Sequence, residues 1–286
     1  MKLIKYFFEF IFLSAFFFIF KIIGYKNASN LGELVGIIFG PFFRNKSKIQ
    51  NNLKNSKIGN SEEDRNQIIK NMWGNYGRIL AEYPYIKKFK NNTLEKHIKV
   101  NGTEVLEDIK KNKKQVVFIS GHFNNFELMA MQIESYGIDV AAIYRPLNNI
   151  FLNKKMEKIR KNYICKKQIK KGRSGTREML ELFKDGSSIA LMIDQRVSEG
   201  IQVNFFNRKC STTTIPAQLV KKYNCEVIPV YIERKNKINF EITFSKAIKF
   251  ENKDNLEDIT LKLNSILENM ILKNVDQWIW THNRWK

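Results

Sequence analysis

The sequence predicts an α/β protein with a mixed, largely parallel sheet flanked by helices in an αβα sandwich, preceded by an N-terminal membrane helix. Three observations predict it. Short apolar runs alternate with helical patterns after residue 115, a later run alternates apolar and polar residues, and the chain starts with a long aromatic stretch. The 286 residues, 43% of them hydrophobic, are enough for a full core. With only 5 prolines and no linker or repeat, we expect a membrane helix over 1–25 and a single domain over 26–286.

The N-terminal stretch 3–23 is apolar and rich in phenylalanine, and residues 10–20 carry no charge. A helix of about 20 residues is long enough to cross the hydrocarbon core of a bilayer. Glu9 lies inside the stretch and argues against a simple span, so a helix lying in the membrane surface stays open. No small-x-small cleavage site follows the stretch, which argues against a cleaved signal peptide. The basic residues from Lys26 onward predict a cytoplasmic body.

The remaining elements follow from periodicity. Residues 27–95 read as mainly helical, and Ser61 followed by three acidic residues is a typical helix start. Beyond them, β-branched and aromatic runs predict strands at 116–120, 140–144, 188–193 and 226–232, and the alternating run 238–244 predicts an antiparallel strand. Helices are expected at 151–164, 175–184, 214–223 and 255–273.

The segment from 121 to 127 is the main candidate for chemistry. Gly121 and His122 follow the first predicted strand, and Glu127 comes five residues after the histidine. Open α/β sheets bind ligands at the carboxyl ends of their strands, and histidine has the pKa best suited to proton transfer near neutrality. Five helical residues rotate by about 140°, so the two side chains meet only if His122 lies in the turn before a helix. A structural histidine and a dipole-favoured glutamate are the alternative interpretation.

Two further polar segments follow predicted strands. Arg145 comes directly after 140–144 and is fixed by Pro146, so its guanidinium can bind a phosphate in bidentate fashion. Asp194 ends the strand at 188–193 and is followed by Gln195. A carboxylate there can orient an arginine, bind a hydroxyl or simply cap a turn.

Charge and cysteine content narrow the class of partner. The net charge of +21, with 49 Lys+Arg against 28 Asp+Glu, favours a polyanionic partner such as a phospholipid surface, a phosphorylated lipid or nucleic acid. The 3 cysteines are odd in number and lack metal-ligand spacing, which predicts reduced thiols. No P-loop occurs. We therefore expect neither a metal nor a cofactor.

Taken in order, these segments resemble a known family. The pattern resembles the H-x4-D/E motif of the lysophospholipid-acyltransferase superfamily, in the form found in bacterial lipid A biosynthesis acyltransferases, including the late lauroyl and myristoyl transferases. The similarity spans residues 1–286. The matching segments are Gly121-His122 with Asn125 and Glu127, Tyr144-Arg145-Pro146 with Asn148, Asp194-Gln195, Pro216-Ala217, and the tail 280–286.

The resemblance implies transfer of a secondary fatty acyl chain from acyl-carrier protein to a hydroxyl of a lipid A precursor glycolipid. His122 would act as general base and Glu127 would hold its ring. The implied location is the cytoplasmic side of the bacterial inner membrane, against an anionic lipid surface and without nucleic acid. The resemblance implies substrate-binding roles for Arg145, Arg160, Asp194, Gln195 and Asn125.

Two positions depart from the family pattern, because Asn124 and Phe126 replace a common glycine and tryptophan. Asparagine tolerates a left-handed backbone better than other non-glycine residues, and phenylalanine keeps an aromatic wall. Two alternatives stay open. One is an acyltransferase acting on a lysophospholipid or an amino-acid-based lipid, and the other is a non-enzymatic basic module for membranes or nucleic acid. The sequence does not predict the acyl length, the acylated position or the oligomeric state.

Overall fold

A computed structural model describes residues 2–91 and 93–285, so Met1 and Lys286, the last residue of the tail motif, lie outside the described residues. Its main sheet has seven strands in the order β1-β9-β8-β2-β5-β3-β4. The pairs are parallel except for β8 with β9, which is antiparallel. The strands are β1 (Ile98–Asn101), β2 (Val116–Ser120), β3 (Val140–Tyr144), β4 (Lys167–Lys170), β5 (Ser188–Met192), β8 (Glu226–Lys235) and β9 (Asn239–Phe244).

The predicted mixed, largely parallel sheet is therefore confirmed, including its antiparallel portion. Strands β1 and β4 were not predicted because they are edge strands of four residues that each contain lysine. A two-stranded hairpin of β6 (Ile201–Phe205) and β7 (Arg208–Thr212) was also missed. It turns through Phe206 and Asn207, whose φ of 50° and 56° is rare for side chains other than glycine.

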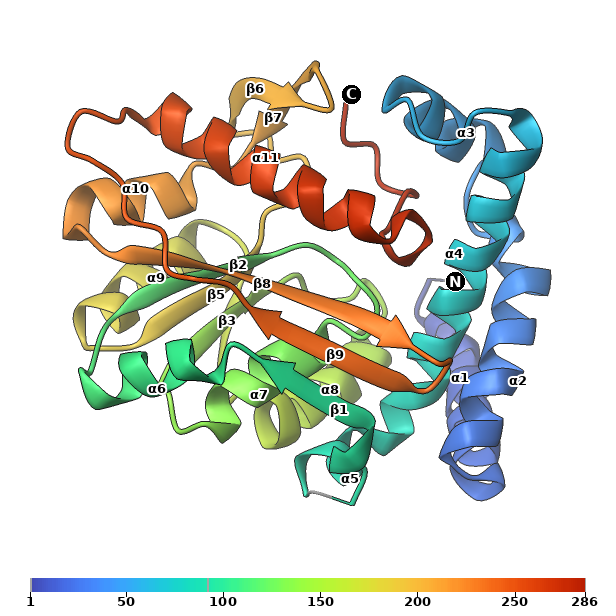
Figure 1. Cartoon of the computed structure of the whole chain (residues 1–286). Coiled ribbons are helices and arrows are strands. Elements are labelled where there is room, and N and C mark those ends of the chain that lie inside the picture. Colours follow the sequence, from blue (N-terminus) through green and yellow to red (C-terminus); the bar gives the residue numbers. More distant parts are fainter. Residues whose placement is uncertain (1, 92, 286) are drawn as a thin grey trace.

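Helices cover both faces of the sheet. Figure 1 shows α10 and α11 on one face and α7 and α8 on the other. The four helices predicted beyond residue 150 are confirmed, and residues 160–164 continue α8 as a π-helical turn. The helices of this part are α6 (Thr103–Lys111), α7 (Glu127–Ser135), α8 (Ile150–Ile159), α9 (Arg173–Lys184), α10 (Ile215–Tyr223) and α11 (Leu256–Lys273).

The N-terminal third is helical, as predicted. Ser61 forms the expected cap, because its hydroxyl accepts from the Asp64 N–H while the Asp64 side chain accepts from the Ser61 N–H. Helices α2 and α4 cross closely at glycines, and a Cβ added to Gly77 would lie 1.8 Å from the Gly32 carbonyl oxygen. The helices here are α1 (Lys2–Ile23), α2 (Tyr25–Phe39), α3 (Lys46–Asn55), α4 (Glu62–Glu82) and α5 (Ile86–Lys90).

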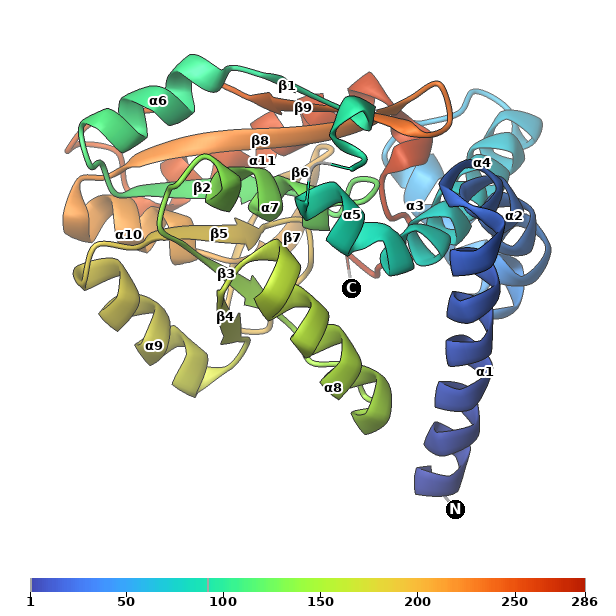
Figure 2. The ribbon, with the colours of Figure 1, turned by 90° about the horizontal axis from the view of Figure 1, so that it is seen from below.

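Helix α1 extends away from the body beside α8 (Figure 2). It is the one described helix that is long and apolar enough to cross a membrane, and only 11% of its apolar window is buried. Glu9 faces the body, where its Oε2 accepts from Asn149 Nδ2 at 3.1 Å. The same amide donates to the Tyr6 carbonyl at 2.8 Å. A carboxylate inside the apolar stretch therefore has a polar partner on the loop that starts α8.

Candidate active site

His122 and Asp194 form the central contact of the site. Nδ1 of His122 lies 2.8 Å from Oδ1 of Asp194, and the His122 backbone N–H donates to Oδ2 at 2.7 Å. The Trp278 indole donates to the same Oδ2 at 2.9 Å. Because a carboxylate accepts only, the proton of the neutral ring sits on Nδ1. Nε2 is thereby left able to accept a proton.

The sheet register explains why these two residues meet. Strands β2 and β5 are parallel neighbours, and Ser120 lies opposite Met192. His122 and Asp194 each follow two residues later, so both emerge from the same edge of the sheet. The turn after β2 is tight, because Asn124 has a φ of 42°. The prediction that Asn124 keeps a left-handed backbone at this position is confirmed.

The surroundings of His122 set its protonation. Burial alone would lower the pKa of the ring, but the charge and hydrogen bond of Asp194 outweigh burial and leave the pKa of His122 raised. Burial likewise opposes ionisation of Asp194, yet its contacts with His122 hold the pKa of the carboxyl below its usual value. Phe126 packs edge-on against the imidazole with ring centroids 4.9 Å apart. The predicted aromatic wall is therefore present.

Glu127 makes a different set of contacts from the one expected. It is the first residue of α7, and its Oε1 accepts from the Tyr83 hydroxyl at 2.6 Å. The Nε and Nη2 groups of Arg160 donate to the same oxygen at 2.8 and 2.7 Å. The carboxylate that holds the His122 ring is Asp194, which corrects the expectation that Glu127 holds it. Glu127 instead points toward Tyr83, the residue after α4, and toward the π-helical turn.

Arg160 contacts the Glu127 carboxylate on one side and the Tyr144 ring on the other. Burial lowers the pKa of its guanidinium, but the Glu127 charge outweighs this and the pKa of Arg160 is raised. Its guanidinium also lies 5.5 Å from the centroid of the Tyr144 ring. Nη1 is buried without a partner among the described residues, although Arg160 lines the cavity beside His122. Arg160 was predicted to bind substrate, and its Nη1 amino group is free to donate hydrogen bonds to a ligand in the cavity.

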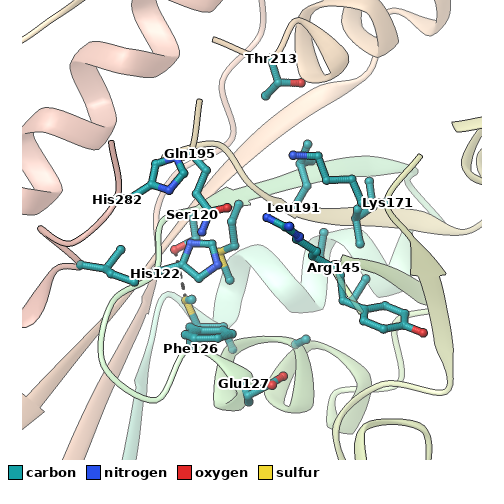
Figure 3. Close-up of a pocket in the computed structure, with 18 of the residues that line it drawn as sticks. Ser120, His122, Phe126, Glu127, Arg145, Lys171, Leu191, Gln195, Thr213 and His282 are labelled. Carbon is teal, nitrogen blue, oxygen red and sulfur yellow. Dashed lines mark hydrogen bonds between the residues drawn. The ribbon is translucent and has the colours of Figure 1, made fainter. Parts of the chain in front are cut away.

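A cavity of about 660 Å³ opens at His122 (Figure 3). Its inner wall is apolar and is built from β2, α7, β3 and β5. Ala142 and Ala190 face each other on β3 and β5, so their small side chains leave space in this wall. The apolar lining includes Phe118, Met129, Ile133 and Leu191. A cavity with this lining fits an unbranched hydrocarbon.

Two cations stand at adjacent strand ends on the other side of the cavity. Tyr144 of β3 lies opposite Lys170 of β4, and Arg145 and Lys171 follow them. Both line the cavity and point into it (Figure 3). No described carboxylate lies within salt-bridge distance of either. Arg145 was predicted here, whereas Lys171 was not singled out as a site residue.

Of the remaining predicted residues, one lines the cavity and two are buried away from it. Gln195 lines the cavity, as expected for a substrate-binding residue. Asp194 is fully buried beneath His122, so its place in the site is that of a ring partner. Asn125 is also fully buried, and its Nδ2 donates to Glu82 Oε2 at 3.2 Å. In this structure the Asn125 side chain contacts Glu82 at the end of α4 and does not line the cavity, where the prediction had placed it.

His282, a residue of the tail motif that was given no role in the site, lines the cavity near Gln195 (Figure 3). Its Nε2 accepts from the Arg196 backbone N–H at 3.0 Å, and burial lowers its pKa to about 4. The ring is therefore neutral near pH 7. It is held there because Arg284, two residues later, is fully buried and donates to the Ser211 carbonyl at 2.8 Å. The only sequence signal was its place in the tail motif.

Within residues 2–91 and 93–285, no cluster of three His, Cys, Asp or Glu side chains can hold a metal ion. Cys165, Cys210 and Cys225 are buried and free. The pKa of each thiol is raised by burial, so the three are unreactive near neutrality. The predicted reduced thiols agree with this geometry.

A histidine–carboxylate pair at the carboxyl edge of a mostly parallel sheet, beside a largely apolar cavity, has the general base and the hydrocarbon-binding space that acyl transfer needs. The family comparison agrees, since the model of the bacterial lipid A biosynthesis acyltransferases matches residues 1–286. The chain belongs to this family, which confirms the resemblance seen in its motifs.

Three similar proteins share 24% or less of their sequence with this chain. The lipid A biosynthesis acyltransferase of Haemophilus influenzae is 24% identical over 233 residues, which cover 79% of this chain and 72% of the relative. The lipid A biosynthesis palmitoleoyltransferase of Escherichia coli K12 is 22% identical over 263 residues, covering 90% and 84%. The solved 1-acyl-sn-glycerophosphate acyltransferase of Thermotoga maritima aligns with a TM-score of 0.40 at 13% identity, over 90% of this chain and 100% of that one.

Proposed function

We propose that this protein transfers a secondary fatty acyl chain from acyl-carrier protein to a hydroxyl of a lipid A precursor. The observation that carries the proposal is the His122–Asp194 pair, with Nδ1 and Oδ1 2.8 Å apart, at the opening of the apolar cavity. The cavity takes the acyl chain and places its thioester near the imidazole. Membership of the lipid A biosynthesis acyltransferase family supports a lipid A precursor as the acceptor. The polar residues that line the cavity near His122, such as Gln195, leave room for the acceptor hydroxyl.

The first step uses His122 as a general base. Nε2 takes the proton of the acceptor hydroxyl, and the oxygen attacks the thioester carbonyl carbon. Asp194 stabilises the imidazolium that forms, as a carboxylate does in other base–acid pairs. The tetrahedral intermediate then expels the carrier thiolate, which takes the proton back from Nε2. An ester bond forms, a thioester bond breaks, and the histidine returns to its neutral state.

Cations beside the cavity assist this chemistry. Arg145 and Lys171 extend toward the same space as His122, where either can stabilise the oxyanion or a phosphate of the acceptor (Figure 3). Arg160 keeps Nη1 for a further hydrogen bond to substrate. Glu127 bonds to Arg160 and makes no hydrogen bond to the His122 ring, so it is a positioning residue.

The membrane location belongs to the same proposal. Helix α1 exposes leucine, isoleucine and phenylalanine along its length, among them Phe8 at 66% and Ile22 at 66% exposure. We take residues 1–25 as the anchor and 26–286 as one catalytic domain on the cytoplasmic side of the inner membrane. The net charge of +21 favours an anionic lipid surface.

The direct test is transfer by the purified full-length protein. Acyl-carrier protein that bears a radiolabelled acyl chain is incubated with a tetra-acylated lipid A precursor and the enzyme in mixed micelles. The product is identified by mass. We expect one added acyl chain on the glycolipid and a loss of about 10²- to 10⁴-fold in rate for His122→Ala. Acylation of a lysophospholipid in place of the glycolipid would contradict the proposed acceptor. A normal rate in His122→Ala would contradict the mechanism.

A further inference from the structure

A second groove, of about 260 Å³, lies next to the catalytic cavity. It is formed by the start and exposed side of α3, by β7 and by the C-terminal tail. Its lining is mostly polar, with side-chain amides, a hydroxyl and two cations, together with the aromatic ring of Trp285. The residues that decide its chemistry are Asn45, Ser47, Asn51, Asn55, Lys48 and Arg208.

The lining selects a ligand that carries both hydroxyls and negative charge. Asparagine amides donate and accept hydrogen bonds, as sugar hydroxyls require. Lys48 and Arg208 have no carboxylate within salt-bridge distance among the described residues, and no acidic side chain lines the groove. Two cations in a groove without acids attract an anion, and the guanidinium can bind a phosphate in bidentate fashion.

The groove is adjacent to the catalytic cavity. Lys48 and Asn283 line both spaces. Asn283 directly follows His282, whose ring lies in the catalytic cavity (Figure 3). A ligand with one hydroxyl at His122 can therefore extend past Lys48 and Asn283 to Arg208. The two spaces divide the substrate into an apolar part and an extended polar part.

We propose that this groove binds the anionic sugar headgroup of the acceptor lipid, at a distance from the hydroxyl that is acylated. The inference rests on the proposed function, because it assigns the acceptor of that same reaction. In this arrangement Lys48 and Arg208 bind a phosphate carried by the headgroup, and Asn51 and Asn55 bind its hydroxyls. The groove determines affinity for the acceptor, whereas His122 and Asp194 determine the chemical step.

The test compares Arg208→Gln with Lys209→Gln, its neighbour on β7, which is exposed and does not line the groove. Initial rates are measured with the phosphorylated glycolipid and with the same lipid after enzymatic removal of its phosphates. We expect Arg208→Gln to raise KM for the phosphorylated acceptor by about tenfold, the effect of one lost hydrogen bond to a charged group, with kcat changed by less than about twofold. On the dephosphorylated acceptor it should match the wild type. Lys209→Gln should match the wild type on both.

A second variant guards against a local packing effect, because the Arg208 guanidinium lies 5.7 Å from the centroid of the Trp285 ring. Lys48→Gln changes the other cation, which makes no such contact among the described residues, and should raise the same KM. An equal rise on both acceptors would overturn the phosphate contact. A rise in KM for the acyl donor instead would assign the groove to the carrier. Failure of the wild type to acylate any glycolipid would contradict the proposed function itself.

Discussion

At the level of single residues, the proposed chemistry depends on one hydrogen bond, between Nδ1 of His122 and Oδ1 of Asp194 at 2.8 Å. The carboxylate fixes the tautomer and favours the protonated ring, so it acts on both the geometry and the basicity of Nε2. Two further donors, the His122 N–H and the Trp278 indole, keep Asp194 ionised and in place. The reaction rate should therefore depend on pH through the protonation of His122.

The first prediction concerns Asp194→Asn. The base must be neutral, and the pKa of His122 is raised, so kcat/KM of the wild type falls as the pH drops through a value above 6.5. Removal of the carboxylate takes away the contacts that raise this pKa. We expect kcat to fall by about 10²- to 10⁴-fold and the acidic limb of the pH profile to move to lower pH.

Rates from pH 5 to 9 measure both effects, with the exposed Asp185→Asn as the matched control. Asp185 ends α9, and its exchange should leave the profile unchanged. If the acidic limb of Asp194→Asn stays where it is in the wild type, Asp194 does not set the basicity of His122.

The second prediction concerns Glu127→Gln, which removes the charge paired with Arg160. The two side chains are 9% and 12% exposed, so the guanidinium stays buried without a counter-charge. We expect the free energy of unfolding to fall by about 3 kcal/mol, at the lower end for a broken buried pair because glutamine still accepts a hydrogen bond. The rate should fall, and the acidic limb should move to lower pH by less than in Asp194→Asn, because the Glu127 charge adds to the larger effect of Asp194 on the pKa of His122.

Urea unfolding in detergent micelles measures the stability of Glu127→Gln and of the wild type. The pH profile of the rate is measured on the same samples. The conservative variant Glu127→Asp should recover part of the rate, since it restores the charge. A shift of the acidic limb in Glu127→Gln as large as in Asp194→Asn would return Glu127 to the role of ring partner.

Sequence reasoning placed His122 and Asp194 correctly at the ends of two strands but paired His122 with Glu127. The missing information was the strand order. β5 lies beside β2 although β3 and β4 come between them in the chain, and only this order sets Ser120 against Met192. A motif spacing gives distance along the chain, whereas the carboxylate that reaches the imidazole arrives from another strand.

At the level of elements, the apolar cavity depends on small residues in two neighbouring strands. Ala142 of β3 lies opposite Ala190 of β5, and both line the cavity. The periodicity of the sequence predicted both strands with their ends within a residue, because continuous β-branched runs are typical of buried parallel strands. It did not show which alanines face the cavity, since both faces of such strands are buried.

The third prediction is a change in acyl length for Ala142→Leu. Leucine adds three carbons to the cavity wall, and each methylene kept out of an apolar site loses about 0.8 kcal/mol. We expect the variant to lose about 10- to 100-fold in kcat/KM for the longest chain that the wild type accepts, and to prefer donors about three carbons shorter. Competition between acyl donors of different lengths, with products separated by mass, measures the preference.

Ala15→Leu on the exposed side of α1 is the matched control, because it adds the same carbons far from the cavity. It should leave the length preference unchanged. An equal loss of rate for short and long donors in Ala142→Leu would show that the acyl chain does not reach this wall.

At the level of the whole molecule, the helical N-terminal part and the sheet are joined by a buried polar network around Glu82. This carboxylate, at the end of α4, is fully buried. It accepts from Ser29 of α2 at 2.9 Å, from Arg234 Nη2 of β8 at 3.1 Å and from Asn125 of the catalytic turn at 3.2 Å. Its neighbour Tyr83 holds Glu127. The end of α4 and the turn after it therefore support the site directly, a role that the helical pattern of the sequence did not predict.

The last prediction tests this network through Glu82→Gln. The variant leaves the Arg234 guanidinium buried without its counter-charge, and we expect the free energy of unfolding to fall by about 3–5 kcal/mol. The catalytic turn also loses the charge that holds Asn125, so kcat should fall even where the protein remains folded. Glu251→Gln, which breaks an exposed pair with Lys253, should change stability by less than about 1 kcal/mol.

A double variant separates the network from simple loss of a charge. Glu82→Gln with Arg234→Met removes both buried ions, so it should unfold less easily than Glu82→Gln alone, because no unpaired guanidinium remains. The rate should stay low in the double variant, since Asn125 and the turn after β2 still lack the carboxylate. If the double variant instead loses as much stability as the two single changes added together, Glu82 and Arg234 act independently. The N-terminal helices would then contribute to the site by packing alone.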